Sequence, residues 1–69
     1  MSAMKLTVSY DEQADILYMA REGEEELVEE VYPGVNLEFD RQGRLIGIEI
    51  LRASQVLRDV AGPLLQKAG

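Results

Sequence analysis

The sequence of 69 residues predicts an α+β fold, in which an antiparallel five-stranded meander sheet carries a short C-terminal helix packed on one face. Three observations lead to this prediction. Short apolar runs with a period of two, separated by turn residues, are typical of strands. The segment from Val35 to Leu51 has the pattern of a β-hairpin, and the apolar residues after Arg52 recur with helical spacing. No linker or internal repeat divides the chain, so residues 1–69 are expected to form a single domain.

The first two predicted strands are joined by a turn rich in aspartate. Leu6, Val8 and Tyr10 alternate with polar residues, which predicts a half-buried strand from Leu6 to Tyr10. Residues 10–15 are typical of a turn, because an Asp carboxylate can accept hydrogen bonds from backbone N–H groups just downstream. The continuously apolar segment from Ile16 to Ala20 is the second predicted strand.

The third predicted strand, Glu25 to Tyr32, follows a chain reversal that contains Gly23, and it is more polar than the others. Its charge favours an edge or a solvated position in the sheet. Pro33 and Gly34 then fit the centre of a type II turn, since proline fixes φ and glycine takes the positive φ that follows.

The last two predicted strands, Val35 to Phe39 and Arg44 to Leu51, form a hairpin around the loop of residues 40–43. If these four residues form the loop, Leu37 lies opposite Ile46 and Val35 lies opposite Ile48. One face of the hairpin is then apolar, and it consists of Val35, Leu37, Ile46, Ile48 and Ile50.

A helix of about two turns is predicted after Arg52 from the spacing of apolar residues. The apolar stripe consists of Ala53, Val56, Leu57 and Val60. Ser54 is a candidate N-cap, and Gly62 with Pro63 is typical of a helix end. Leu64 and Leu65 either add one further turn or belong to a tail, so residues 58–69 are expected to hold the end of the helix and the tail.

Both faces of the predicted sheet carry apolar side chains, and one short helix cannot cover both. On the face opposite to the hairpin's apolar row we expect Ile16, Tyr18, Leu45 and Leu51. One alternative is that strand ends and the tail fold over this second face. The other is that a second subunit covers it through a two-fold interface, which makes a homodimer the main expectation.

The composition excludes several classes of function. Seven basic against thirteen acidic side chains give a net charge of −6, which disfavours nucleic-acid binding because phosphates are bound by basic residues. The chain has no cysteine and no histidine, so the usual catalytic triads and zinc sites are absent, and we expect neither an enzyme nor a cofactor. No signal peptide or membrane-spanning run is recognisable, which favours a cytoplasmic protein that does not bind membranes.

Several acidic and aromatic residues remain as candidate sites. Asp11, Asp15 and Asp40 could bind a hard cation such as calcium or magnesium, but they lack the spacing of a calcium loop and are more typical of turn caps. Glu49 is interpreted as a paired or solvated residue rather than an acid in a cleft. Tyr10, Tyr18 and Tyr32 suit either interface anchors or partly buried strand ends.

The densest charge cluster lies between Glu22 and Glu30. It consists of Glu22, Glu24, Glu25, Glu26, Glu29 and Glu30. One interpretation is an acidic surface that engages a basic protein partner. The other is a solvated loop followed by an edge strand whose charge prevents aggregation.

Three segments carry a resemblance to a known family. They are Tyr10-Asp11-x-x-Ala14-Asp15-x-Leu17-Tyr18, then Gly34-Val35-x-Leu37-x-Phe39-Asp40, then Gly43-x-Leu45-Ile46-Gly47-Ile48-Glu49-Ile50-Leu51-x-Ala53-Ser54. In this order they resemble the small prokaryotic family catalogued as domain of unknown function 2283, over residues 4–57. The resemblance implies a compact domain of consecutive strands with a terminal helix and implies no known activity or catalytic residue. Some members are encoded beside small toxin-like proteins, which would imply an antitoxin-like role.

Three functions follow as hypotheses. The first is a homodimeric protein–protein interaction module whose contact is made by the second apolar face. The second is an antitoxin-like acidic protein that covers a basic partner with the segment from Glu22 to Glu30. The third, which the composition disfavours, is a cation binder or enzyme that works with carboxylates.

Overall fold

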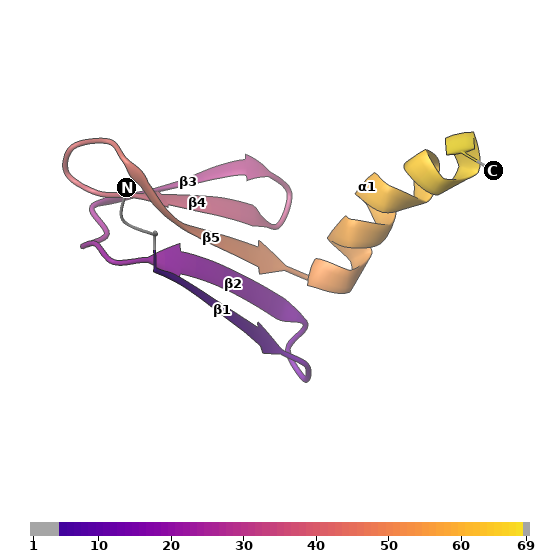
Figure 1. The fold of residues 1–69 in the computed structure, drawn as a ribbon, viewed down its shortest axis with the longest axis horizontal. Coiled ribbons are helices and arrows are strands. Elements are labelled where there is room, and N and C mark those ends of the chain that lie inside the picture. The colour runs from indigo at the N-terminus through magenta and orange to yellow at the C-terminus, as the bar shows by residue number, and fades with distance from the viewer. Residues whose placement is uncertain (1–4, 69) are drawn as a thin grey trace.

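A computed structural model describes residues 5–68, which form one antiparallel sheet of five strands and one C-terminal helix (Figure 1). This confirms the α+β class. The strands are β1 (Leu6–Asp11), β2 (Ile16–Arg21), β3 (Leu27–Tyr32), β4 (Val35–Phe39) and β5 (Leu45–Leu51), and the helix is α1 (Ala53–Ala68).

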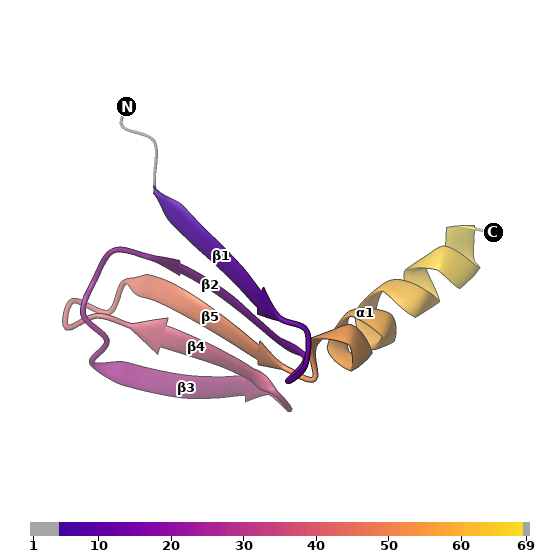
Figure 2. The same ribbon diagram turned by 90° about the horizontal axis from the view of Figure 1, so that it is seen from below.

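The strand order is β1-β2-β5-β4-β3, which differs from the consecutive order of a meander (Figure 2). The segment after Arg21 crosses to the far edge of the sheet, so β3 pairs only with β4 and β5 is inserted between β2 and β4. The reason lies in the residues themselves. The uncharged row of Ile46, Ile48 and Ile50 makes β5 suited to the centre, and the charge of β3 suits an edge, as the sequence predicted.

The hairpin of β4 and β5 is shifted from the predicted register. Leu37 lies opposite Ile48 rather than Ile46, because a β-bulge between Glu38 and Phe39 leaves one extra residue on β5. Phe39 consequently pairs with Leu45. As predicted, Leu37 and Ile48 lie on the same face of the sheet. Leu45, in contrast, does not lie on the face predicted for it, because the bulge interrupts the alternation along β5.

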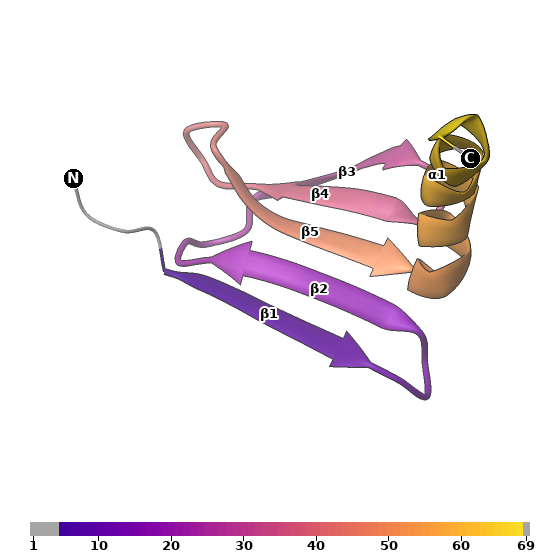
Figure 3. The ribbon, with the colours of Figure 1, turned by 45° about the vertical axis from the view of Figure 1, so that its right-hand side comes forward.

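The helix is longer than the predicted two turns, and it does not pack on a face of the sheet. It runs for 16 residues through Gly62 and Pro63, so the predicted helix end is wrong. Proline has a φ that fits a helix, and its cost in the interior is the loss of one backbone hydrogen bond and a clash with the preceding turn. From the end of β5 the helix projects away from the strands and stands beyond the end of the sheet (Figures 1 and 3).

The buried core of the chain is small. Among the described residues, the buried apolar side chains are Ile46, Ala53 and Val56, and none of the large ones is fully buried. Ile46 lies beneath the loop that precedes β3, where a Cβ on Gly23 would come within 2.9 Å of the Ile46 Cγ2 atom. The predicted coverage of one sheet face by the helix is therefore not observed, because only the first turn of α1 reaches the sheet.

Candidate functional site

One face of the sheet is apolar across its width and uncovered. Register places Val8, Met19, Ile48 and Leu37 side by side in one row, and Tyr10, Leu17, Ile50 and Val35 in a second row. We call these eight residues the open face. Side chains that pair across neighbouring strands lie on the same side of a sheet, so the two rows form one continuous apolar surface.

Within residues 5–68, no segment of the chain forms a covering layer on the open face. All residues of β2 and β4 are only partly buried although β2 and β4 each have neighbours on both sides, and β1 is exposed throughout. Val8 is 57% exposed and Tyr10 51%. At one end of the face there is a hollow of about 540 Å³, lined mainly by apolar side chains that include Leu6, Met19 and Ile48.

The opposite face is polar at its centre. Tyr18 lies across from Glu49, and Glu49 lies across from Asn36, whose amide donates a long hydrogen bond of 3.5 Å to the Glu49 carboxylate. The hydroxyl of Tyr18 donates to Glu38 Oε1 at 2.7 Å. This hydrogen bond to a carboxylate, together with partial burial, raises the pKa of Tyr18 to about 12.

A glycine makes room for this hydrogen bond. Gly47 lies opposite both Ala20 and Glu38, and a Cβ at Gly47 would collide with the Glu38 carboxylate and lie 3.3 Å from the Tyr18 hydroxyl. Glu25 reaches the same cluster from the loop before β3. Partial desolvation and the neighbouring charge of Glu38 raise the pKa of the Glu25 carboxyl.

The four residues expected at a subunit contact are only partly brought together. Ile16 pairs directly with Leu51, and Tyr18 lies on the same face two residues further along β2. Leu45 is separated from them, because the bulge directs it to the hollow beside Met19. Tyr18 is also engaged with Glu38, which gives it a polar role within the chain. A contact made by these four residues stays a prediction.

The three candidate cation ligands each cap the chain at a turn. Asp11 Oδ1 accepts hydrogen bonds from the backbone N–H groups of Gln13 and Ala14, both at 3.1 Å. Asp15, at a positive φ of 57°, accepts hydrogen bonds from both the backbone and the side chain of Ser54. Within residues 5–68 no group of three acidic side chains is arranged to hold a metal ion.

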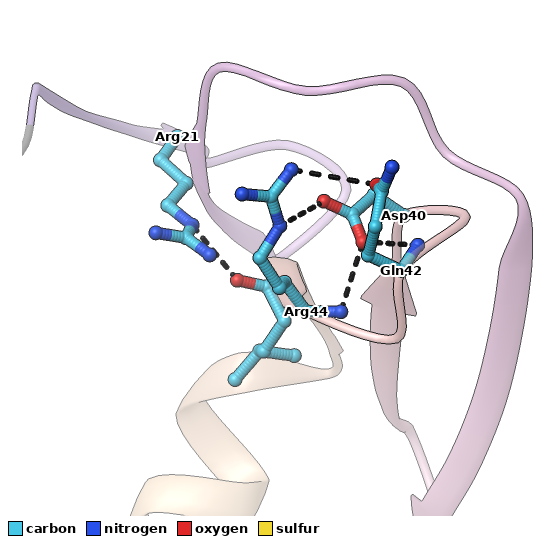
Figure 4. Close-up of polar contacts among 5 residues, drawn as sticks. Arg21, Asp40, Gln42 and Arg44 are labelled. Atoms are coloured by element: carbon cyan, nitrogen blue, oxygen red, sulfur yellow. Dashed lines mark hydrogen bonds and ion pairs between the residues drawn. The ribbon is translucent and has the colours of Figure 1, made fainter.

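Asp40 organises the loop between β4 and β5 (Figure 4). Its Oδ1 atom accepts from the backbone N–H groups of Gln42 and Arg44 at 2.9 Å, and its Oδ2 atom forms an ion pair of 2.7 Å with Arg44 Nε. These contacts, chiefly the backbone hydrogen bond from Arg44, lower the pKa of Asp40. Beside the loop, Arg21 Nε donates to the Leu45 carbonyl at 2.9 Å, where backbone pairing between β2 and β5 has ended at Gly47.

The acidic segment from Glu22 to Glu30 occupies a loop and the edge strand β3, and its residues are all exposed. Glu29 pairs with Leu37 and so lies at the border of the open face, whereas Glu30 lies on the other side. The exposed ring of Tyr32 pairs with Val35 and extends the second row of the open face to the edge of the sheet.

Sequence reasoning missed a second uncovered apolar surface, which lies on the helix. Leu57, Val60 and Leu64, spaced by three and four residues, share one side of α1, and we call them the distal stripe. They are 53%, 58% and 63% exposed. The same spacing was present in the sequence beyond Gly62 and Pro63, and the expected helix end there concealed it.

Comparison with known proteins identifies a family and nothing more specific. The sequence model described as "Protein of unknown function (DUF2283)" matches residues 7–54, which is more than half of the chain. No curated protein and no solved structure matches. Over the described residues, no helix has both the length and the apolar character needed to cross a membrane.

Proposed function

Since the chain belongs to the family of proteins of unknown function DUF2283, which carries no assigned activity, we propose a function from its surface: a homodimeric protein–protein interaction module in which a second copy covers the open face. The observation that carries the proposal is the pair of apolar rows that cross four strands and that no other part of the described chain, residues 5–68, covers. Soluble monomers rarely leave so continuous an apolar surface in water.

The dimensions of the chain support the same proposal. Its radius of gyration is 14.1 Å, whereas a compact domain of this length has a value of about 11 Å. It exposes 5647 Å² of surface, about 1,300 Å² more than a typical folded monomer of 7.7 kDa. A standard interface removes about 800 Å² from each partner, so the excess is large enough for one interface.

The two faces of the sheet differ in the free energy of removing water from them when a partner binds. A partner on the open face removes water from apolar side chains only, at a gain of about 25 cal/mol per Å². A partner on the opposite face would have to desolvate Glu38 and Glu49, which costs free energy unless each carboxylate gains a new partner. The open face is therefore the favoured side for the second copy.

A matched pair of substitutions on β1 tests the proposal. Thr7 and Val8 are neighbours of nearly equal shape, both are exposed, and they point to opposite faces. Val8→Glu places a charge on the open face, and Thr7→Glu places it on the other. In sedimentation equilibrium we expect a mass of twice 7.7 kDa for the parent chain and for Thr7→Glu, and a shift to monomer for Val8→Glu.

A parent chain that stays monomeric at millimolar concentration would refute the proposal. A dimer disrupted by Thr7→Glu and not by Val8→Glu would assign the interface to the other face, where Ile16, Tyr18 and Leu51 lie. Circular dichroism of each variant controls for loss of folding.

A second candidate function is the antitoxin-like one, in which the acidic segment covers a basic protein partner. The specific observation in its favour is that Glu24 and Glu26, in the loop before β3, and Glu29, on the edge strand β3, are all exposed. Charge complementarity of this kind is screened by salt. Partners retained by the parent chain at low salt should be lost at high salt and lost with Glu-to-Gln changes at these three positions.

A further inference from the structure

Two uncovered apolar surfaces occur in one chain, and the chain cannot bring them together by itself. The open face lies on the sheet, and the distal stripe of Leu57, Val60 and Leu64 lies on a helix that projects beyond the end of the sheet (Figure 3). The stripe continues the side of the helix whose first turn is buried through Ala53 and Val56. Among the described residues, the same apolar side of α1 is thus covered by the sheet at its first turn and is exposed along the rest.

The outer part of α1 needs a covering surface to remain helical. Gly62 and Pro63 are the two least favourable residue types for a helix interior, and both lie within it. Isolated helices of this length are marginal in water, and most of their stability in proteins comes from packing of the apolar side. A helix that runs through Gly62 and Pro63 to Ala68 therefore implies a surface against which the distal stripe packs.

The start of the helix prevents it from folding back onto its own sheet. Arg52, at a positive φ of 49°, separates β5 from α1, and there is no further linker. The first two N–H groups of the helix, those of Ala53 and Ser54, donate to the backbone carbonyl and the carboxylate of Asp15. These bonds fix the direction of the helix relative to the turn between β1 and β2.

We propose that the dimer forms by reciprocal exchange of α1, so that the distal stripe of each copy lies across the open face of the other. This inference rests on the proposed function and adds which element of the second copy makes the contact. The lengths agree, because residues 57–64 span about 12 Å as a helix and the four strands of the open face span about 14 Å. A two-fold axis makes the contact reciprocal, so each copy gains a cover for both of its open surfaces.

Charge favours the helix over the sheet as the covering element. Residues 1–52 carry five basic and twelve acidic side chains, a net charge of −7, whereas residues 53–69 carry two basic and one acidic, a net charge of +1. Two sheets packed face to face would bring the two negative regions together. The helical segment, with its net charge of +1, brings opposite net charges together instead.

Cross-linking between different copies tests the exchange, and the absence of cysteine in the parent chain makes single thiols possible. We would mix a copy carrying Leu64→Cys with a tagged copy carrying Met19→Cys and add a short bifunctional thiol reagent. Exchange predicts a cross-linked pair of the two. The control copy carries Ala20→Cys, which lies next to Met19 on the opposite face, and should give no such product.

A second pair of variants measures the contribution of the stripe. Leu64 lies on the distal stripe, and Leu65, next to it, lies off the stripe and is 73% exposed. Leu64→Glu should weaken dimerisation at least tenfold, while Leu65→Glu should change it less than threefold. Because both positions are exposed within the chain, neither change should unfold the sheet.

The outcomes separate the two proposals. A monomeric parent chain refutes the homodimer and the exchange together. A dimer that is cross-linked only between two Leu64→Cys copies, or that tolerates Leu64→Glu as well as Leu65→Glu, refutes the exchange and leaves the homodimer standing.

Discussion

The carboxylate of Asp15 binds the first turn of α1 through Ser54, which is 39 residues further along the chain. Asp15 Oδ1 accepts from the Ser54 backbone N–H at 3.0 Å, and Oδ2 accepts from the Ser54 hydroxyl at 2.6 Å. The sequence predicted Ser54 as the N-cap of its own helix, whereas the cap comes from the turn between β1 and β2. Tyr10 completes the arrangement with a hydrogen bond of 2.7 Å to Asp15.

This cap makes the helix sensitive to acid. The hydroxyl of Ser54, then that of Tyr10, lowers the pKa of Asp15 from 3.8. The charged form is favoured in the folded state, so its contribution to stability is present above about pH 4 and is lost as pH falls through the lowered pKa. Asp15→Asn keeps the left-handed conformation available and removes the charge.

Thermal unfolding at a fixed protein concentration measures this effect. We expect Asp15→Asn to lower the Tm at pH 7 and to reduce the loss of Tm as the pH falls below about 4, relative to the parent chain. Asp11→Asn, at the other end of the same turn, serves as the control. Equal acid profiles for the parent chain and Asp15→Asn would contradict the proposed role of the cap.

The hydrogen bond from Tyr18 to Glu38 predicts that Tyr18 titrates late. With its pKa raised to about 12, Tyr18 should ionise well after an ordinary phenol, and its contribution to stability should be lost as pH rises from 10 towards 12. Ultraviolet titration should show a late component that Tyr18→Phe removes. The hydrogen bond to Asp15 also raises the pKa of Tyr10, so Tyr10→Phe identifies the part of the curve that belongs to Tyr10. The substitution should cost about 1 kcal/mol at neutral pH, because Glu38 loses a partner.

Two glycines should respond to alanine in opposite directions. Gly47→Ala places a methyl group against the Glu38 carboxylate and the Tyr18 hydroxyl, which we expect to destabilise the fold by about 1–3 kcal/mol. A Cβ at Gly62 meets nothing within 4 Å and improves the helix, so Gly62→Ala should stabilise the protein by about 1 kcal/mol. Chemical denaturation of both variants checks the prediction, and a gain in stability for Gly47→Ala would contradict it.

The loop between β4 and β5 should depend on one buried carboxylate. Asp40 is 8% exposed and satisfies two backbone donors, so Asp40→Ala should disorder the loop and lower stability. Arg44→Gln removes only the ion pair with a side chain that is 65% exposed, and its effect should be much smaller. Amide hydrogen exchange at Gln42 and Gly43 distinguishes the two. Similar protection in Asp40→Ala and the parent chain would show that the carboxylate does not hold the loop.

The elements were largely predictable from local pattern, whereas their arrangement was not. Period-two alternation, a short continuous apolar run at Ile16 to Ala20, and turn residues identified all five strands, because these are properties of neighbouring residues. Such a pattern states which side chains share a face and does not state which strand lies beside which, so the pairing of β2 with β5 was missed. The register of β4 and β5 depended on a bulge, which a loop count cannot reveal.

The candidate site followed the same division. The apolar row of Leu37, Ile48 and Ile50 was found from sequence, but it was expected to lie under the helix. The helix was expected to end at Gly62 and Pro63, because both residue types disfavour a helix interior. Only packing of the helix beyond its first turn can offset this local preference, and such packing cannot be read from the sequence. Leu45 was grouped with the wrong neighbours, because the bulge and not the alternation along the strand determines the face of the sheet on which Leu45 lies.

The order β1-β2-β5-β4-β3 has a consequence for the protein while it is being synthesised. The central strand, β5, is the last strand to leave the ribosome, since it ends at Leu51 and joins β2 to β4. Until then β2 and β4 each present an unpaired backbone edge in the nascent chain. The five-stranded sheet can therefore form only after Leu51 has left the ribosome, and until then these edges are open to pairing with other chains.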